Sequence, residues 1–347
     1  MPRPPHPASL SSVARAAGVS SMTVSRVFRG EQNVAESTRR QVIAKAQELG
    51  YQPNPHISRL MEVVRNNRTQ QLRAVLAVIR DDGSNDKPQG AVHNYVSIEH
   101  IRAKAELHGY GAEEFVLGSN GMTAERLGGI LKARGVDGIL ISPQSLSCFA
   151  AKIDYSSFSS IVFGYGLISP QLHRASTNMT QGILEATERL EKRGYQRIGI
   201  AVTEWVNSRA DHTYSGAVLH YQQALPQQRR VPLLLLQNKL AQQDEETFCN
   251  WIQQHKPDAI ISFHAPVPYW LQHKLNLRIP EDIGVVVHDW MPGMEAYAGI
   301  DHQRAHVAAA AVDLVATKLK HNERGIPPVP QQILIPPRFV DGPSIRP

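Results

Sequence analysis

Cysteine is scarce in this chain, with Cys148 and Cys249 the two that occur in 347 residues. Two thiols provide neither a disulfide framework nor the spaced cysteine pairs of a zinc site, and this usage fits the reducing cytosol. The chain also lacks an apolar signal region after Met1, and no apolar run is as long as a membrane span. We therefore expect a cytoplasmic protein that has no membrane partner.

The motifs that commonly identify enzymes are absent as well. Fifteen histidines are present, yet none has the His-x-x-x-His spacing together with the third partner that a metal site needs. There is no phosphate-binding Gly-x-x-x-x-Gly-Lys and no nucleophile elbow. The run Gly164-Tyr165-Gly166 lacks the third glycine of a dinucleotide fingerprint. We therefore expect no catalytic centre, no metal and no cofactor.

Acidic residues are few near the N-terminus, so the charge is unevenly distributed. Residues 1–73 contain 11 Arg and Lys against 4 Glu, a balance of +7, whereas the rest of the chain has 26 basic and 27 acidic residues. A basic segment of this kind favours binding to nucleic-acid phosphates. The length allows a small head and a larger body with cores of its own.

Residues 10–27 predict two short helices joined by a tight turn. In the first helix the apolar residues follow the 3.6-residue period, at Leu10, Val13, Ala14 and Ala17. Gly18 can then leave the helix at positive φ. Ser20 is a good N-cap for the second helix, on which Val24 and Val27 form the inward stripe.

The second helix presents Ser21, Met22, Ser25 and Arg26 outward. This is the geometry of a helix-turn-helix, in which the second helix meets base edges in the major groove. Arg26 is the best candidate for reading a base, because a guanidinium can bind guanine through two hydrogen bonds. Met22 has an alternative role, which is packing within the head.

Residues 36–48 predict a third helix, ended by Gly50, with an inward stripe of Val42, Ile43, Ala46 and Leu49. Pro53 and Pro55 follow this helix. Residues 57–61 then form a stub that is too short to be a stable helix alone.

Several spaced motifs of this N-terminal region match one family in the same order. They are Val-Ala-x-x-Ala-Gly-Val-Ser at 13–20, Thr-Val-Ser-Arg-Val at 23–27, Thr38-Arg39 with Val42, Gly50-Tyr51-x-Pro53-Asn54, and Leu60. In these motifs the chain resembles the lac-repressor (LacI/GalR) family of bacterial transcriptional regulators, and the body resembles it more weakly from Val75 on. The resemblance implies a homodimer that binds a palindromic double-stranded DNA operator and responds to a small-molecule effector.

The resemblance assigns base readout and DNA bending to two groups of residues. In the family, the positions of Ser21 and Met22 distinguish one operator from another, and here they would act with Arg26. Paired hinge helices would enter the minor groove, where the apolar side chains wedge a base step and kink the duplex. The hinge residues are Ile57, Leu60 and Met61. The alternative is that these three residues pack the head on the body.

Contacts with DNA phosphates set the register and carry no sequence information. The candidates are Ser9, Ser20, Thr23, Ser25, Arg29, Tyr51 and Asn54. The chain departs from the family pattern at Arg29, where the family usually has Asn, and at Ala35, where it usually has Ser. Arg29 should preserve a backbone contact, whereas Ala35 removes an N-cap and a phosphate donor from the third helix.

From residue 74 on, apolar runs alternate with amphipathic helices, which is typical of α/β parallel sheets wound on both faces. Strands are predicted at 74–79, 111–116, 136–141, 160–163, 197–202, 231–236, 258–263 and 284–288. Helices are predicted near 92–108, 123–134, 182–193, 211–225, 243–255 and 268–276. Two such sets in tandem predict a two-lobed body like that of periplasmic binding proteins, behind an all-α helix-turn-helix head.

Three segments are expected to cross between the lobes, at 164–178, 299–303 and 325–331. The helix at 304–319 would return to the first lobe, and the strand at 331–335 to the second. The expected parts are a disordered tip at 1–8, the head at 9–50, the hinge at 51–61, a connector at 62–73, and the body at 74–347, with lobe 1 at about 74–176 and 302–328 and lobe 2 at about 177–300 and 329–345.

Ligands of doubly wound lobes bind at the carboxyl ends of the strands. The side chains that follow the predicted strands are Asp81, Asp82, Gln144, Tyr165, Trp205, Asn207, Arg209, His264, Asp289 and Trp290. Aromatic faces beside carboxylates and amides favour a flat polar ligand such as a sugar, and nucleobases fit nearly as well. Apart from Asp289, these positions are equally compatible with solvated loop tips.

The family resemblance narrows the effector site. Asp289 matches the acidic position that contacts the effector, and His302 lies where a crossover approaches the ligand. Thr213 stands in the register of the family's cleft arginine, with Arg209 and His212 nearby. The candidate effector-binding residues are Asp81, Gln144, Trp205, Arg209, Asp289 and His302.

Two functions remain open at this point. The first is an effector-responsive homodimeric regulator, a repressor rather than an activator, that dimerises through the predicted helix at 92–108 and is associated with the nucleoid when bound to DNA. The second is a solute-binding or enzymatic body with an accessory DNA-binding head. The missing signal region argues against a secreted solute-binding protein.

Overall fold

The computed structural model describes residues 9–28, 34–51, 74–81, 96–118, 121–142, 152–165, 167, 169–237, 241–263 and 266–347, with the backbone alone of Asp81 and Ala241. The predicted tip and connector, and the hinge beyond Tyr51, lie outside the described residues. Contacts divide the chain into two units, Met1–Leu72 and Arg73–Pro347. None of the helices in the described ranges combines the length and the apolar character that crossing a bilayer requires.

The N-terminal unit contains the helices α1 (Leu10–Ala16), α2 (Ser21–Phe28) and α3 (Glu36–Glu48). Ser9 and Ser12 form a reciprocal cap at the start of α1. Gly18 makes the turn at φ +60°, and the backbone N–H of Thr23 donates to Oγ of Ser20 over 3.1 Å at the start of α2. The predicted helix-turn-helix is therefore confirmed, with the expected residues at the turn and at the cap.

The head has a small core made of Val13, Ala14, Ala17, Val24, Val27, Val42 and Ala46. The predicted inward stripe of α3 was wrong at two positions, because Ile43 and Leu49 are each 40% exposed. The two helices against which α3 packs are only seven and eight residues long, so they cover a narrow line along it. Ala35 gives α3 no side-chain cap, because its methyl group cannot accept a hydrogen bond.

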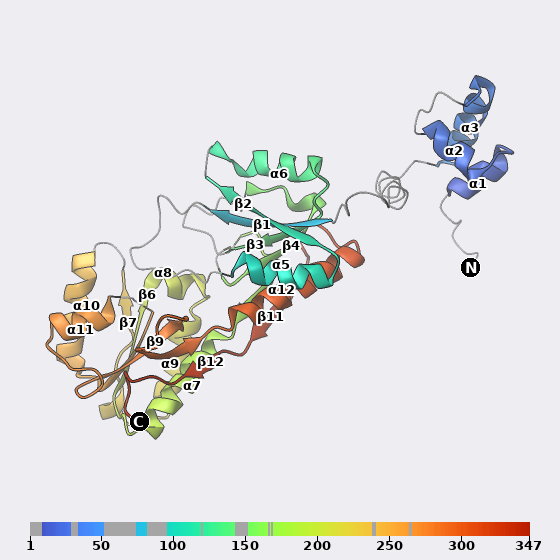
Figure 1. Cartoon of the computed structure of the whole chain (residues 1–347). Helices are drawn as coiled ribbons and strands as arrows, with labels where there is room; N and C mark the ends of the chain where they lie inside the picture. Colours follow the sequence, from blue (N-terminus) through green and yellow to red (C-terminus); the bar gives the residue numbers. More distant parts are fainter. Residues whose placement is uncertain are drawn as a thin grey trace. The chain divides into compact units, whose positions relative to one another are not determined.

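The first sheet of the body has the strand order β11-β5-β4-β3-β1-β2 and is parallel throughout. Its strands are β1 (Val75–Asp81), β2 (Gly111–Leu117), β3 (Gly138–Ile141), β4 (Ser159–Phe163), β5 (His173–Thr177) and β11 (Gln332–Ile335), with the 3-10 helix η3 (Tyr155–Ser157) before β4. Helices α5 (Ile98–Leu107) and α12 (Arg304–Lys320) cover one face, and α6 (Ala124–Ala133) covers the other (Figure 1).

The second sheet has the order β12-β10-β9-β8-β6-β7, and its edge strand β12 is antiparallel to β10. Its strands are β6 (Ile198–Thr203), β7 (Leu234–Leu236), β8 (Ala259–Ser262), β9 (Gly284–Trp290), β10 (Ala298–Asp301) and β12 (Arg338–Val340). Helices α7 (Met179–Lys192) and α9 (Thr213–Gln223) cover one face, and α10 (Ala241–His255) and α11 (Val267–His273) cover the other. The short helices α8 (Glu204–Arg209) and η4 (Gln227–Arg229) flank α9.

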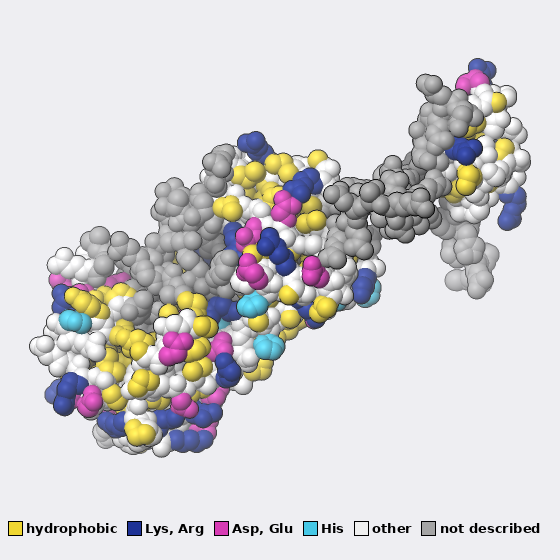
Figure 2. All heavy atoms as spheres, viewed as in Figure 1, with side chains coloured by type: hydrophobic (Ala, Val, Ile, Leu, Met, Phe, Trp, Pro, Cys, Tyr) yellow, Lys and Arg dark blue, Asp and Glu magenta, His cyan; other side chains and the backbone are white. Residues whose placement is uncertain are grey.

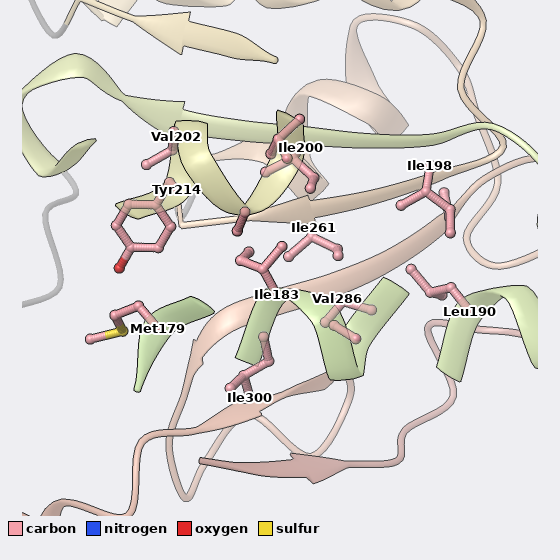
Figure 3. Close-up of a cluster of buried hydrophobic side chains, with 14 of the residues drawn as sticks. Met179, Ile183, Leu190, Ile198, Ile200, Val202, Tyr214, Ile261, Val286 and Ile300 are labelled. Atoms are coloured by element: carbon pink, nitrogen blue, oxygen red, sulfur yellow. The ribbon is translucent and has the colours of Figure 1, made fainter. Parts of the chain in front are cut away.

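Burial on both sheet faces explains the continuous apolar strands. Figure 3 shows Ile183 and Leu190 of α7 facing Ile198 and Ile200 of β6, in a cluster in which each of these four is at most 2% exposed. Parallel strands covered by helices on both faces have this composition. The predicted α/β doubly wound body is confirmed.

One strand was assigned to the wrong sheet. The segment at 331–335 was expected in the second lobe, but β11 runs parallel to β5 in the first sheet, with Gln332 opposite Arg174. Ile333 and Ile335 pack on the same cluster as α12. The alternation of apolar residues predicts a strand, but it does not tell which of two sheet edges the strand joins.

The crossovers are shorter than predicted. Asn178 leads from β5 to α7, residues 302–303 lead from β10 to α12, and residues 336–337 lead from β11 to β12. The expected crossover at 325–331 was therefore wrong, and those at 164–178 and 299–303 were too long because β5 and β10 pair within them. Local capping explains one helix start, since the side chain of Asn178 accepts from the N–H of Gln181 and α7 begins at Met179 rather than at 182.

The C-terminal turn after β12 leaves no room for a side chain at Gly342. A Cβ there would lie 2.6 Å from the carbonyl oxygen of Tyr297 and would also meet the backbone N of Ala298. We expect Gly342→Ala to lower the free energy of unfolding by roughly 1–3 kcal/mol, as overpacking does, in urea unfolding followed by circular dichroism. The control is Gly129→Ala in α6, where a Cβ meets nothing within 4 Å. This substitution should raise the free energy of unfolding by about 0.5–1 kcal/mol. Equal effects of the two changes would contradict this explanation.

Candidate functional site

The outward face of α2 is set by its inward residues. Val24 is fully buried and Val27 is 4% exposed, so the residues between them and before them on the helix face outward. Ser21, Met22 and Arg26 are exposed, and Ser25 is half-buried. Met22 is 54% exposed and takes no part in the core of the head. Its alternative role, packing within the head, is therefore not found.

Apart from Ser25 on α2, the candidate phosphate contacts fall into three groups. Ser9, Ser20 and Thr23 are at helix starts, where the hydroxyls of Ser20 and Thr23 lie 2.9 Å apart. Tyr51 packs on Phe28, with the ring centroids 5.6 Å apart. Arg29 and Asn54 lie outside the described residues, as do the hinge residues Ile57, Leu60 and Met61.

Basic side chains occur over the surface of the N-terminal unit, as Figure 2 shows in dark blue. On α3 they are paired with acidic residues. Arg40 lies 3.4 Å from Glu36, and Lys45 lies 2.6 Å from Glu48. Exposed pairs of this kind contribute little to stability, so these cations remain available for contacts with phosphates.

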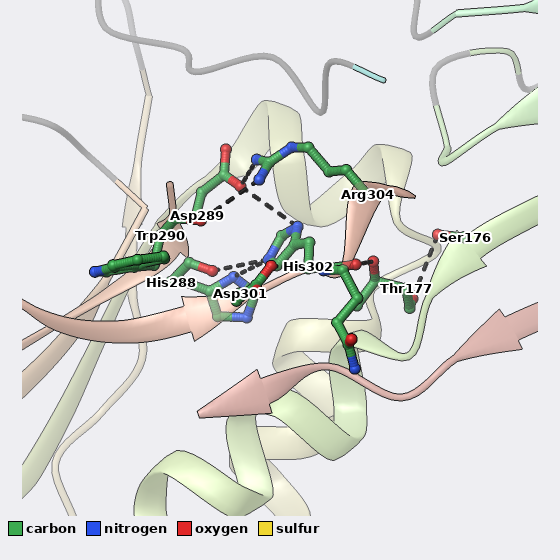
Figure 4. A network of polar contacts seen from close by, with 9 residues as sticks. Ser176, Thr177, His288, Asp289, Trp290, Asp301, His302 and Arg304 are labelled. Atoms are coloured by element: carbon green, nitrogen blue, oxygen red, sulfur yellow. Dashed lines mark hydrogen bonds and ion pairs between the residues drawn. The ribbon is translucent and has the colours of Figure 1, made fainter. Parts of the chain in front are cut away.

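In the body, four side chains at the carboxyl end of the second sheet form one network (Figure 4). Asp289, near the end of β9, is 3% exposed. Nη2 of Arg304 forms an ion pair with Oδ1 of this carboxylate, and Nδ1 of His302 lies 3.4 Å from the same oxygen. His288 completes the network, because Nε2 of His302 lies 2.8 Å from its carbonyl oxygen.

These contacts define the protonation of His302. A carbonyl oxygen only accepts, so Nε2 carries the proton and donates it to His288. In the neutral ring Nδ1 then faces Asp289 as an acceptor, and the carboxylate is balanced by Arg304 instead. Burial lowers the pKa of His302, although Asp289 acts in the opposite direction. Burial, together with His302, lowers the pKa of His288 well below its usual value.

Two further candidates lie in α8. Arg209 stacks over Trp205, with Cζ 4.7 Å from the ring centroid. Within the described ranges, Nε1 of Trp205 is buried without a hydrogen-bond partner. Asn207 has a structural role, because its Oδ1 accepts from the backbone N–H and the hydroxyl of Ser215 and so joins α8 to α9.

The remaining effector candidates cannot be placed by side chain. Gln144 lies outside the described residues, and only the backbone of Asp81 is described. The structure brings together Asp289 and His302, as the sequence predicted, and adds His288 and Arg304, which sequence reasoning missed. A cavity of about 10 Å³ adjoins this network and is lined by Val96, Phe163, Gly164, Ser176, Thr177, His302, Arg304 and Val307. It has room for about one water molecule.

Acidic, histidine and cysteine side chains do not form a metal site within the part of the chain that the structure describes, where no three of them come together as ligands. The network at Asp289 instead combines one carboxylate, one guanidinium and two neutral imidazoles. Such a set can accept hydrogen bonds from a polar ligand and donate hydrogen bonds to it.

Comparison with known proteins finds similarity to transcriptional regulators. Residues 9–54 match the family described as "Bacterial regulatory proteins, lacI family". The sucrose operon repressor of Streptococcus mutans is 25% identical over 355 residues, covering 97% of this chain and 99% of that protein. Among solved structures, a CelR–cellobiose complex has TM-score 0.55 at 20% identity, covering 97% of this chain and 99% of that one. A lac repressor dimer bound to operator and the anti-inducer ONPF has TM-score 0.54 at 18% identity, covering 98% and 100%. These two structural likenesses concern the fold.

The two buried imidazoles predict a pH dependence of stability. Their pKa values are lowered in the folded chain, so unfolding at acidic pH takes up protons. In the unfolded chain the pKa of histidine is about 6.5, so the stability that the two rings confer is fully present above that pH. As the pH falls below it, each ring lowers the free energy of unfolding by at most about 1.4 kcal/mol per pH unit. We expect His288→Gln to flatten the fall in urea midpoint between pH 7.5 and 5.5.

The matched control for this measurement is His220→Gln, which changes an exposed histidine on α9. His220→Gln should retain the pH profile of the unaltered protein, because that side chain remains in water when the chain folds. A profile that His288→Gln leaves unchanged would show that the buried pair does not titrate on unfolding.

Proposed function

We propose that this chain, whose residues 9–54 match the lacI family of bacterial regulatory proteins and which is similar over almost its whole length to a sucrose operon repressor, represses transcription by binding a palindromic operator as a homodimer. Its affinity for the operator is controlled by a small molecule bound between the two lobes of the body. The observation that carries the proposal is the exposed face of α2 on a basic head, joined to a two-lobed body. The relatives reported above are regulators rather than enzymes, and the proposal includes no catalytic activity.

On the head, α2 enters the major groove of the operator. Arg26 reads guanine, and Ser21 and Met22 contact neighbouring bases, with the thioether suited to a thymine methyl. The phosphate contacts come from the residues named above, including Arg29 and Asn54. This division follows from chemistry, since phosphate contacts position the protein and base contacts specify the sequence.

The hinge couples the body to the DNA. We propose that Leu60 of each subunit, with Ile57 and Met61 beside it, wedges a base step of the minor groove where the two hinges pair. The cost of unstacking is a few kcal/mol and is repaid by contacts that the bend allows. Because the hinges must pair, operator binding depends on the dimer, which we place on α5 and its neighbours in the first lobe.

The body senses the effector. Trp205, Arg209, Asp289 and His302 are proposed contacts at the lobe junction, with Asp81 and Gln144 completing the site. The CelR structure is a complex with cellobiose, and the S. mutans relative is a repressor of a sucrose operon, which supports a carbohydrate as the effector class. As a regulator that binds chromosomal DNA, the protein would act in the cytoplasm, at the nucleoid when bound.

The role of Arg26 can be tested by replacing it with Ala. Two duplexes are compared: an operator-like palindrome upstream of its own gene, and a scrambled sequence. We expect the preference for the palindrome, expressed as the ratio of the two affinities, to fall about 5- to 150-fold, which corresponds to a loss of roughly 1–3 kcal/mol of discrimination. Fluorescence anisotropy titrations at one fixed salt concentration measure this ratio. An unchanged ratio would remove Arg26 from base readout.

A charge-matched control separates readout from electrostatics. Arg40→Ala removes one positive charge from α3, where Arg40 is 80% exposed. It should change the affinities for both duplexes alike, because a phosphate contact is insensitive to sequence. Loss of selectivity in Arg40→Ala equal to that in Arg26→Ala would contradict the assignment of the reading face.

The wedge predicts a change in DNA shape. Leu60→Ala removes the side chain that enters the base step, so the operator should bend less in the complex while the head still binds its half-sites. Energy transfer between dyes at the two ends of the operator measures the bend. Identical bends with both proteins would instead support the alternative, in which Leu60 packs the head on the body.

A further inference from the structure

The ion pair between Asp289 and Arg304 joins the two lobes of the body. Asp289 belongs to β9 of the second sheet, whereas Arg304 is the first residue of α12, which packs on the first sheet. The side chains are 4% and 14% exposed. The charges are therefore held where the chain crosses between the lobes, at the place where an effector is expected to bind.

Arg304 has a donor that this arrangement does not use. Nη2 is paired with Asp289, and Nη1 lies 3.4 Å from the carbonyl oxygen of Trp290. Nε is buried and has no hydrogen-bond partner within the described residues. A buried donor without an acceptor is unfavourable, so an acceptor oxygen that reaches Nε would relieve a cost already present.

The carboxylate of Asp289 uses one of its two oxygens in these contacts. The ion pair with Arg304 and the contact with His302 both fall on Oδ1 of Asp289, and Figure 4 shows its second oxygen pointing away from Arg304 and His302. The pair thus presents one N–H donor and one carboxylate oxygen without net charge.

We propose that Arg304 is a ligand-contacting residue of the interlobe site, which donates its Nε–H to an oxygen of the effector while its terminal nitrogens stay on Asp289. This inference rests on the proposed function and adds to it a residue from the other lobe.

The same geometry selects the chemical class of the ligand. A hydroxyl both donates and accepts, so one hydroxyl-rich molecule can accept from Arg304 and donate to Asp289. A phosphate or carboxylate would draw Arg304 away and leave the buried Asp289 without its counter-ion, which is strongly unfavourable. The site therefore fits an uncharged polyhydroxy ligand rather than a sugar phosphate or a sugar acid.

Lysine at position 304 tests the use of Nε. Its ammonium can still pair with Asp289, but lysine has no N–H at the position of Nε. In Arg304→Lys the lobes should stay joined and the melting temperature without ligand should remain near that of the unaltered protein. The affinity for the effector should fall by roughly tenfold to a hundredfold, the effect of losing one hydrogen bond to a charged group.

The experiment uses the full chain and isothermal titration calorimetry. The probes are sucrose, cellobiose and ribose as uncharged sugars, and glucose 6-phosphate and gluconate as charged ones. The matched control is Arg338→Lys, at an exposed arginine of β12 that pairs over 2.8 Å with Asp301, the last residue of β10. This control should bind the sugars as the unaltered protein does.

The outcomes separate the inference from the proposed function. Weaker binding of an uncharged sugar by Arg304→Lys, with Arg338→Lys unaffected, supports the role of Arg304. Equal affinity in Arg304→Lys, or preference for a charged probe, overturns it and leaves the effector-responsive regulator standing. No binding of any probe to the unaltered protein overturns the effector site and Arg304 with it, while operator binding is measured independently.

A second measurement reads the unaltered protein directly and uses the variant only to assign a signal. The side-chain Nε–H signal of Arg304 in the unaltered protein can be assigned by its loss in Arg304→Lys. It should move when the bound sugar supplies an acceptor, and a signal that does not move on saturation would also overturn the proposal.

Discussion

The pairing of one buried charge constrains how the two lobes meet. The carboxylate of Asp289 is nearly inaccessible to water, and an unpaired ion in that position would cost several kcal/mol. Its counter-ion is not on the same lobe but is Arg304, at the start of the helix that returns to the first sheet. The lobes are therefore connected by a buried ion pair as well as by three short crossovers. Any change in the angle between them also changes the surroundings of this charge.

The head, in contrast, depends on local interactions. A serine cap starts each of α1 and α2, and Gly18 makes the turn between them. Seven small aliphatic side chains then form its core. Because these features are close in sequence, they fix the orientation of α2, and with it the exposure of Met22 and Arg26. The surface that we propose reads DNA is thus determined by capping and by helical periodicity.

This difference explains what could be predicted from the sequence. The helix-turn-helix and the buried strands follow from short-range patterns, and both were found. The sheet joined by β11 was not, because two sheet edges accept the same alternation of apolar residues. Asp289 was expected at the site from its position after a strand, and His302 from the family resemblance. Arg304 was missed, because its partner is 15 residues away and nothing in the spacing shows which cation reaches the carboxylate.

The crossover at 302–303 is the part of the body best placed to transmit a signal. A ligand changes a conformational equilibrium only through different affinities for the two states. The carbonyl oxygen of His302 accepts from the hydroxyl of Thr177 in the first sheet over 2.8 Å, while its ring contacts His288 and Asp289 in the second. The backbone and the ring of this one residue thus contact different lobes. A molecule bound here contacts groups whose separation depends on the lobe angle, so its binding energy must differ between the arrangements.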